Sequence, residues 1–266
     1  MEGTVLRFHK KSPLRQQPVC PHFGVCGGCK WQCLPYEEQI SWKQRQVMDN
    51  LIRIGKIELP ECSPILGSVQ TEEYRNKVEF SFANKVWKIF PDQHPEGLSP
   101  VVAEVPVDAP GAVGFHAGGA FDKILPIEEC HLMNSINNHI RNGIRDYCYR
   151  EGLSFHDARE HVGLMRSIMI RLSNSGELML LVQFCIKTEE EHAQAMCLME
   201  WIKQNYPEIT SLLWVNNEKF NDTFGDLPVH TYYGTDHIFL EMEDLRFKVG
   251  PKSFYQTNTQ QAYILY

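Results

Sequence analysis

The fold class of this chain follows from residues 164–185, which read Leu164-MRSIMIRLSNSGELMLLVQF-Cys185. Two apolar runs, Leu164–Leu172 and Glu177–Cys185, have the length typical of strands. The turn-forming segment Ser173-Asn-Ser-Gly176 separates them. Such a segment between two apolar runs predicts a β-hairpin at the centre of a sheet.

Further strands are predicted on both sides of this hairpin. Residues Asn76–Ala83 alternate, with Val78, Phe80 and Phe82 on one face, as in a half-buried strand. Shorter strands are predicted at Gly111–His116, Phe121–Ile127, Ser211–Val215 and within 229–249, with turns at Gly234 and Asp236. The intervening stretch 84–110 contains five prolines, so we expect it to be irregular.

Helical patterns are predicted over residues 35–54, 132–151 and 188–205, and a last helix begins near Thr257. Thr188 and Glu191 have the spacing of a capping box. In the second helix Ile136, Ile140 and Ile144 are expected to face inward, with Arg141 and Arg145 on the outer face. The fold class is therefore α+β, a central, mostly antiparallel sheet with packed helices.

Composition excludes several classes of protein. The 266 residues are 43% hydrophobic and 22% charged, as in a soluble globular protein with a sizeable core. No apolar run reaches the roughly 20 residues that cross a bilayer, and no apolar segment marks a signal peptide. We therefore expect a monomeric, cytoplasmic protein without a membrane partner. The net charge of −7 argues against coating of nucleic acid and leaves room for a local RNA site.

Four of the nine cysteines fall within fourteen residues: Cys20, Cys26, Cys29 and Cys33. Glycines 27 and 28 lie between two of them and allow the tight turn that brings thiolates to one point. The spacing predicts a metal centre, either zinc with Cys33 or His22 as the fourth ligand, or an iron–sulfur cluster with a remote fourth cysteine. A redox pair of Cys26 and Cys29 is less favoured, because no strand precedes Cys26.

The remaining cysteines have a simpler interpretation. Cys148, Cys185 and Cys197 lie in apolar patterns and are expected in the core. Cys130 lies at a loop-to-helix junction, where backbone N–H groups favour a thiolate. Its position alone still favours a structural role.

Several short motifs follow one another along the chain: Pro13–Arg15, Cys20–Gln32, Tyr36–Gln39, Tyr74–Lys77 with Phe80 and Phe82, Gly114–His116 and Ser253–Asn258. Together they resemble the RNA uracil-5-methyltransferases, in particular the iron–sulfur branch that methylates uridine in 23S ribosomal RNA. The cysteine run is the one specific motif, and the shared order strengthens the resemblance.

This resemblance implies a division of the chain. Residues 1–17 are similar to the end of a TRAM domain, 18–245 to a central domain with a 4Fe–4S cluster, and 246–266 to the start of a Rossmann-like domain that binds S-adenosyl-L-methionine (SAM). The last helix pattern ends on apolar residues without a cap. We therefore expect the chain to be a fragment that is inactive alone.

The resemblance also implies site residues. The cluster ligands would be Cys20, Cys26, Cys29 and Cys130, which favours iron–sulfur over zinc and demotes Cys33. Gln256 would contact SAM, and Phe254 would lie near the target base, although a simple core role is the alternative for Phe254.

The chemistry of the family requires a cysteine thiolate that adds to C6 of uracil, and a carboxylate that later removes the C5 proton. The base must also leave its stack. No cysteine here has the context of that nucleophile, and no glycine-rich SAM motif is present, so the catalytic residues are expected beyond Tyr266.

Candidate RNA contacts are Arg75, Lys77, and Lys30 with Trp31. Arg141 and Arg145 are weaker candidates, for which a solvated basic face is favoured. Two other functions stay open: a non-catalytic, metal-stabilised RNA-binding module, and a transfer-RNA uracil-5-methyltransferase.

Overall fold

The computed structural model describes residues 9–88 and 102–266. The helices are α1 (Tyr36–Asp49), the π-helical turn η1 (Asn50–Ile54), α2 (Ile136–Glu151), α3 (Glu189–Asn205) and α4 (Thr259–Leu265). The strands are β1 (Lys77–Ala83), β2 (Ala112–His116), β3 (Ile124–Pro126), β4 (Met165–Leu172), β5 (Leu178–Phe184), β6 (Ile209–Asn216), β7 (His230–Gly234), β8 (Ile238–Met242) and β9 (Leu245–Val249).

Seven strands form one sheet in the order β3-β2-β1-β4-β5-β6-β7, and β8 pairs with β9 in a separate hairpin. The predicted hairpin is β4–β5, with Ile168 opposite Val182 at the centre of the sheet. Strands β5 and β6 are parallel, joined through α3, and the other neighbours are antiparallel. The prediction of a mostly antiparallel sheet is therefore confirmed.

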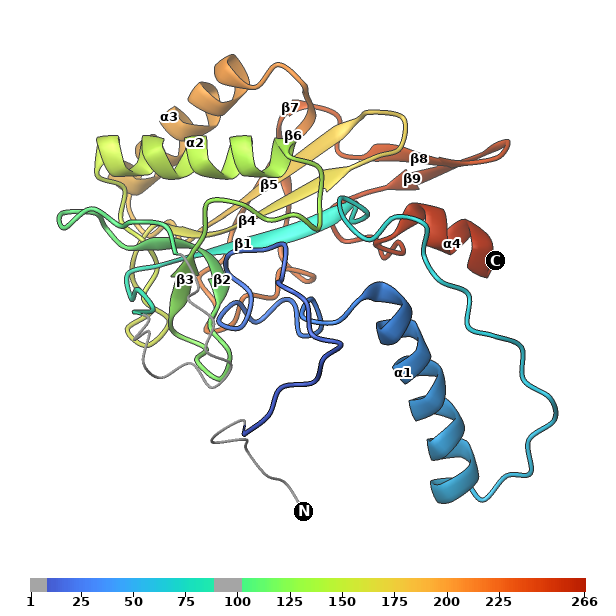
Figure 1. Ribbon diagram of the computed structural model, residues 1–266. Coiled ribbons are helices and arrows are strands. Elements are labelled where there is room, and N and C mark those ends of the chain that lie inside the picture. Colours follow the sequence, from blue (N-terminus) through green and yellow to red (C-terminus); the bar gives the residue numbers. More distant parts are fainter. Residues whose placement is uncertain (1–8, 89–101) are drawn as a thin grey trace.

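The main core lies between the sheet and the helices α2 and α3, which cover one face (Figure 1). Phe80 of β1 and Ile140 and Ile144 of α2 are fully buried there. A smaller core on the opposite face joins the sheet to the β8–β9 hairpin through residues such as Leu213 and Leu240.

Helix α1 differs from the other long helices because none of its residues is buried. It extends away from the sheet (Figure 1), and its Val47 is 56% exposed. Ile54, at the end of the π-helical turn η1 that follows, is 78% exposed. The helix predicted over 35–54 is regular only as far as Asp49, where the π-helical turn begins.

Three sequence predictions are wrong in detail. The helix expected from Leu132 begins at Ile136, because the Leu132 carbonyl accepts a hydrogen bond from the Arg75 N–H (2.8 Å). The strand expected over 121–127 is limited to Ile124–Pro126. Cys197 is exposed, since the buried face of α3 is formed by neighbours such as Leu198 and Ile202.

Other predictions are confirmed. The capping box of Thr188 and Glu191 is present, and Cys148 and Cys185 are buried.

Part of the expected segment 1–17 and part of the irregular stretch 84–110 lie outside the described residues. The expected boundary after residue 245 falls at the start of β9, which pairs with β8. No helix in the described ranges is long and apolar enough to span a membrane.

Ile144 is buried in α2 and Ile54 is exposed in the π-helical turn η1, and this difference in burial predicts different effects of matched substitutions. Ile144→Ala should lower the free energy of unfolding by about 2–5 kcal/mol, because Ile144 is fully buried under the sheet. Ile54→Ala should change it by no more than about 0.5 kcal/mol, because Ile54 is exposed. Urea unfolding measures both, and equal losses would contradict this packing.

Candidate functional site

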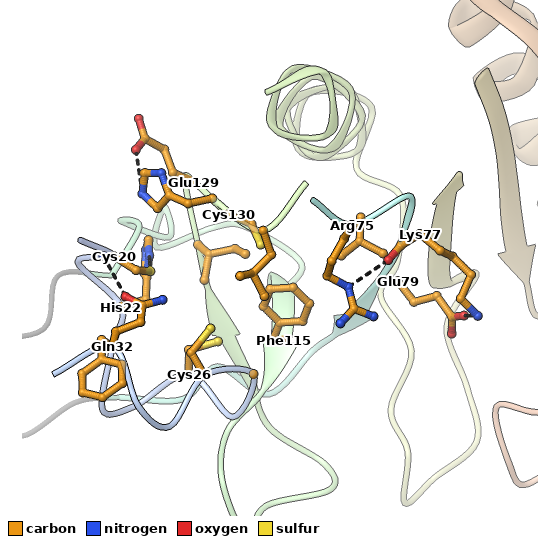
Figure 2. Close-up of a pocket in the computed structure, with 17 residues that line it drawn as sticks. Cys20, His22, Cys26, Gln32, Arg75, Lys77, Glu79, Phe115, Glu129 and Cys130 are labelled. Atoms are coloured by element: carbon orange, nitrogen blue, oxygen red, sulfur yellow. Dashed lines mark hydrogen bonds and ion pairs between the residues drawn. The ribbon is translucent and has the colours of Figure 1, made fainter. Parts of the chain in front are cut away.

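The four cysteines expected to act together line one cavity of about 390 Å³. Cys20, Cys26 and Cys29 come from the loop before α1, and Cys130 comes from the loop between β3 and α2. Figure 2 shows Cys20 and Cys26 on one side of this cavity and Arg75, Lys77 and Glu79 on the other, with Cys130 and Phe115 between them. The fold therefore brings together thiols from two distant parts of the sequence.

Short-range contacts fix the cysteine loop against the sheet. The Cys26 N–H donates to the His22 carbonyl (3.0 Å), which closes a tight turn, and Cys26 forms an isolated bridge with Ala117 after β2. A Cβ on Gly27 would lie 3.1 Å from the His116 carbonyl oxygen. Glycine at this position therefore allows the loop to approach the end of β2 closely.

Burial keeps these thiols protonated at neutral pH. It raises the pKa of Cys20, Cys29 and Cys130, and raises that of Cys26 to about 11. Repulsion from neighbouring cysteine thiolates acts in the same direction for Cys26. A cationic centre would reverse this effect, because a metal ion favours the thiolate form.

No group of three or more His, Cys, Asp or Glu side chains within residues 9–88 and 102–266 forms a metal-binding arrangement as it stands. Of the two other ligands considered for zinc, His22 lines the cavity, with its Nδ1 3.7 Å from the Cys20 Sγ. Cys33 is buried but does not line the cavity. The cavity lining thus distinguishes Cys130 from Cys33.

Arg141 is fully buried, so the expectation that it lies on the outer face of α2 is wrong. It is four residues after Asn137 and three before Ile144, and therefore shares their buried face. Its guanidinium donates to the Glu128 carbonyl and the Asn138 Oδ1 (3.1 Å), and lies 4.8 Å from the Phe80 ring centre.

The charge of Arg141 has no carboxylate partner at ion-pair distance among the described residues. Burial lowers its pKa to about 10, so it is still charged at neutral pH. The Asn138 Oδ1 that it contacts also accepts the Cys130 N–H (2.8 Å). A buried positive charge therefore lies beside the loop of Cys130. Arg145, in contrast, pairs with Glu128 (2.7 Å) and Asp146 (2.8 Å).

Residues 73–76 form a junction between segments that are far apart in sequence. The Glu73 N–H donates to the His131 carbonyl (2.7 Å), directly after Cys130. The Asn76 N–H donates to the Thr257 carbonyl and its side chain to the Gln256 carbonyl, both at 2.8 Å. The start of β1 therefore holds the Cys130 loop and the Gln256 segment together.

The other candidate residues differ in whether they line the cysteine cavity and in how exposed they are. Arg75 and Lys77 line the cysteine cavity, and Lys77 forms an ion pair with Glu79 (2.9 Å). Lys30 is exposed on the cysteine loop outside the cavity lining. Phe254 is 84% exposed, so a core role for it is wrong within the described structure.

The sequence reasoning missed Arg171, a buried side chain that holds the segment before Phe254. Its guanidinium donates to the carbonyls of Gly250 (3.1 Å) and Ser253 (3.0 Å). The available signal was a charged residue within the apolar run of β4, because arginine in such a run needs oxygen acceptors.

Comparison with known proteins shows which proteins the chain is similar to. No family model matches it. It is 55% identical over 265 residues to a protein of Bacteroides thetaiotaomicron named an uncharacterized RNA methyltransferase, covering 100% of this chain and 57% of that protein. Proteins so named from Porphyromonas gingivalis and Chlorobaculum tepidum are 47% and 34% identical, with 56% and 53% of their lengths covered. The chain thus spans about half the length of the curated relatives it matches.

The fold is also similar to a solved methyltransferase structure. Pyrococcus abyssi tRNA (uracil-54, C5)-methyltransferase in complex with S-adenosyl-L-homocysteine matches with a TM-score of 0.63 and 21% identity, over 97% of this chain and 51% of that chain. The relatives of this chain are named RNA methyltransferases, and a similar fold occurs in the solved structure of a tRNA methyltransferase.

The junction predicts that Asn76→Ala weakens the attachment of the Gln256 segment. The substitution removes hydrogen bonds to the Gln256 carbonyl and the Thr259 hydroxyl, and should lower the free energy of unfolding by about 1–3 kcal/mol. Amide hydrogen exchange over 256–259 should accelerate. Asn205→Ala removes a similar bond on the exposed end of α3 and should cost no more than about 0.5 kcal/mol. Unchanged exchange in Asn76→Ala would show that the junction does not hold this segment.

Proposed function

We propose that this chain is part of a SAM-dependent RNA methyltransferase that forms 5-methyluridine. The observation that carries the proposal is the similarity of its whole length to proteins named RNA methyltransferases. The fold shared with a tRNA uracil-C5-methyltransferase supports C5 of uracil as the atom that is methylated. Ribosomal RNA of the 23S type is the proposed substrate, because the cysteine run resembles the branch that acts on it.

Within this function, a 4Fe–4S cluster bound by Cys20, Cys26, Cys29 and Cys130 is the proposed metal centre. Two observations support this ligand set: the four thiols line one cavity, and Cys33 does not. All four are free cysteines, so none is consumed by a disulfide. The bound cluster would supply a covalent link between the loop before α1 and the loop before α2.

The buried charge of Arg141 provides a separate argument for an anionic centre at this place. An uncompensated charge in a protein interior costs several kcal/mol. The described residues offer Arg141 no carboxylate at ion-pair distance, and its hydrogen bonds go to neutral oxygen atoms. If Cys130 and the other three cysteines bind a cluster as thiolates, their negative charge lies near Arg141 and would offset the cost of burying its positive charge.

The remaining residues take roles around this centre. Arg75 and Lys77, on the cavity wall, and Lys30, on the exposed loop, are proposed to bind the RNA backbone. Gln256, held by Asn76, is proposed to contact SAM, and the exposed Phe254, next to Ser253 that Arg171 holds, is proposed to contact the target base. We assign 18–245 to RNA recognition and 246–266 to the beginning of the methyltransferase domain.

Formation of 5-methyluridine tests the proposed function. The protein that contains this chain is incubated with SAM and unmodified transcripts of 23S ribosomal RNA or transfer RNA, and nucleosides are identified by mass spectrometry. We expect 5-methyluridine in the ribosomal transcript.

Product in transfer RNA alone would support the alternative substrate, which the Pyrococcus abyssi structure favours. No product in either RNA, together with a coding sequence after Tyr266 that has neither a SAM motif nor a catalytic cysteine, would favour a non-catalytic RNA-binding module.

The proposed ligand set predicts different results for two buried cysteines. Anaerobically purified protein should contain iron and sulfide and absorb near 400 nm, as clusters of this kind do. Cys130→Ala should lose most of the iron, because Cys130 lines the cavity. Cys33→Ala should retain it, because Cys33 lies outside the lining. The reverse pattern would show that the fourth ligand is assigned wrongly, and stoichiometric zinc without iron would overturn the cluster.

A further inference from the structure

A second cavity, of about 290 Å³, opens at the other end of β1. It is lined by residues at the ends of β1 and β2, by the segment that leads into β3, by the loop between α2 and β4, by Arg166 of β4, and by the loop after β6. It shares no lining residue with the cysteine cavity. None of the residues proposed above for SAM, the target base or the cluster contributes to it.

Two highly exposed aromatic side chains line this cavity. Phe121 is 67% exposed and Phe220 is 82% exposed. They come from separate loops, before β3 and after β6. Exposed aromatic rings that meet at one hollow are typical of binding sites, because each ring offers an apolar face to a planar ligand.

Both loops are fixed by arginine contacts. The Arg159 guanidinium forms an ion pair with Asp122 and lies 5.5 Å from the Phe121 ring centre. Arg166, which is 4% exposed, donates to the carbonyls of Lys219 (2.8 Å) and Asn221 (3.0 Å), on either side of Phe220. The loops that carry the two rings are therefore fixed at the cavity by the rest of the protein.

The charges of the cavity favour a neutral ligand with polar edges. Asp122 is balanced by Arg159, and Asp222 by Arg166 (2.7 Å). Burial and the charge of Arg166 lower the pKa of His156 to about 4, so its ring is neutral at pH 7. The wall therefore has no excess positive charge with which to select a phosphate.

Polar groups for such a ligand are present. The Asp222 side chain is 65% exposed, and Ser81 Oγ and His116 Nε2 lie 3.2 Å apart at the strand ends. Arg159, with a side chain 58% exposed, lies beside Phe121. A flat heterocycle that carries amino and carbonyl groups fits this combination of aromatic faces and hydrogen-bonding groups.

We propose that this cavity binds an unstacked base of single-stranded RNA, stacked on Phe121 or Phe220. The inference rests on the proposed function, since that function supplies RNA as the ligand. Aromatic stacking is the usual way in which proteins hold splayed RNA bases, and it tolerates any base because every base has a π-face. The site would hold a nucleotide away from the target uridine and so position the substrate.

Phe121→Leu combined with Phe220→Leu tests the proposal. Leucine keeps an apolar side chain and removes the aromatic face. Binding of a fluorescein-labelled, unstructured RNA oligonucleotide is measured by fluorescence anisotropy at fixed salt, with a duplex RNA of equal length in parallel. The double variant should bind the single strand about tenfold or more weakly and the duplex unchanged. Phe247→Leu, on β9 and outside the cavity, is the matched control and should bind both as the unaltered protein does.

A second readout locates the base directly. RNA with 5-iodouridine should crosslink on irradiation to Phe121 or Phe220, identified by mass spectrometry. If the unaltered protein binds the single strand and the double variant binds it equally tightly, or if crosslinks map elsewhere, the inference is overturned while RNA binding stands. An equal loss for single strand and duplex also overturns it. If the unaltered protein binds neither RNA, the proposed function itself fails and the inference with it.

Discussion

The backbone pairing at residues 73–76 is the constraint on which the candidate site depends. These residues bond to the segment after Cys130 on one side and to residues 256 and 257 on the other, just before β1 enters the sheet. The cysteine cavity and the Gln256 segment therefore take their relative positions from the start of one strand. The same pairing prevents α2 from starting at Leu132 and fixes the loop from which the Cys130 thiol reaches the cavity.

Buried arginines extend this arrangement to the surrounding loops. Arg141 holds the loop before Cys130, Arg166 holds the loop that carries Phe220, and Arg171 holds the segment before Phe254. Each uses the several donors of one guanidinium to satisfy backbone carbonyls that have no strand or helix partner. Arg166 also has a carboxylate partner in Asp222, and no ion pair is found for Arg141 or Arg171 among the residues described. Loops with candidate functions are thus anchored by charge placed inside the fold.

Features governed by neighbours in sequence could be predicted, and features governed by distant contacts could not. The β4–β5 hairpin, the alternation of β1 and the capping box at Thr188 are local, and all are present. The burial of Arg141 and the exposure of Cys197 depend on which side of each helix the sheet covers. In the candidate site, spacing alone grouped Cys20, Cys26 and Cys29 with Cys33, whereas the family resemblance replaced Cys33 by Cys130. The second cavity is lined by short segments from distant parts of the chain that contain no motif, so it could not be predicted from the sequence.

The four cysteines around the first cavity are proposed to hold one iron–sulfur centre. X-ray absorption at the iron edge of the anaerobically purified protein tests it most directly. The account predicts sulfur neighbours around iron together with iron–iron scattering, which only a cluster produces. Absence of iron, or a single metal ion with nitrogen and sulfur neighbours, would contradict it and would favour a zinc site that includes His22.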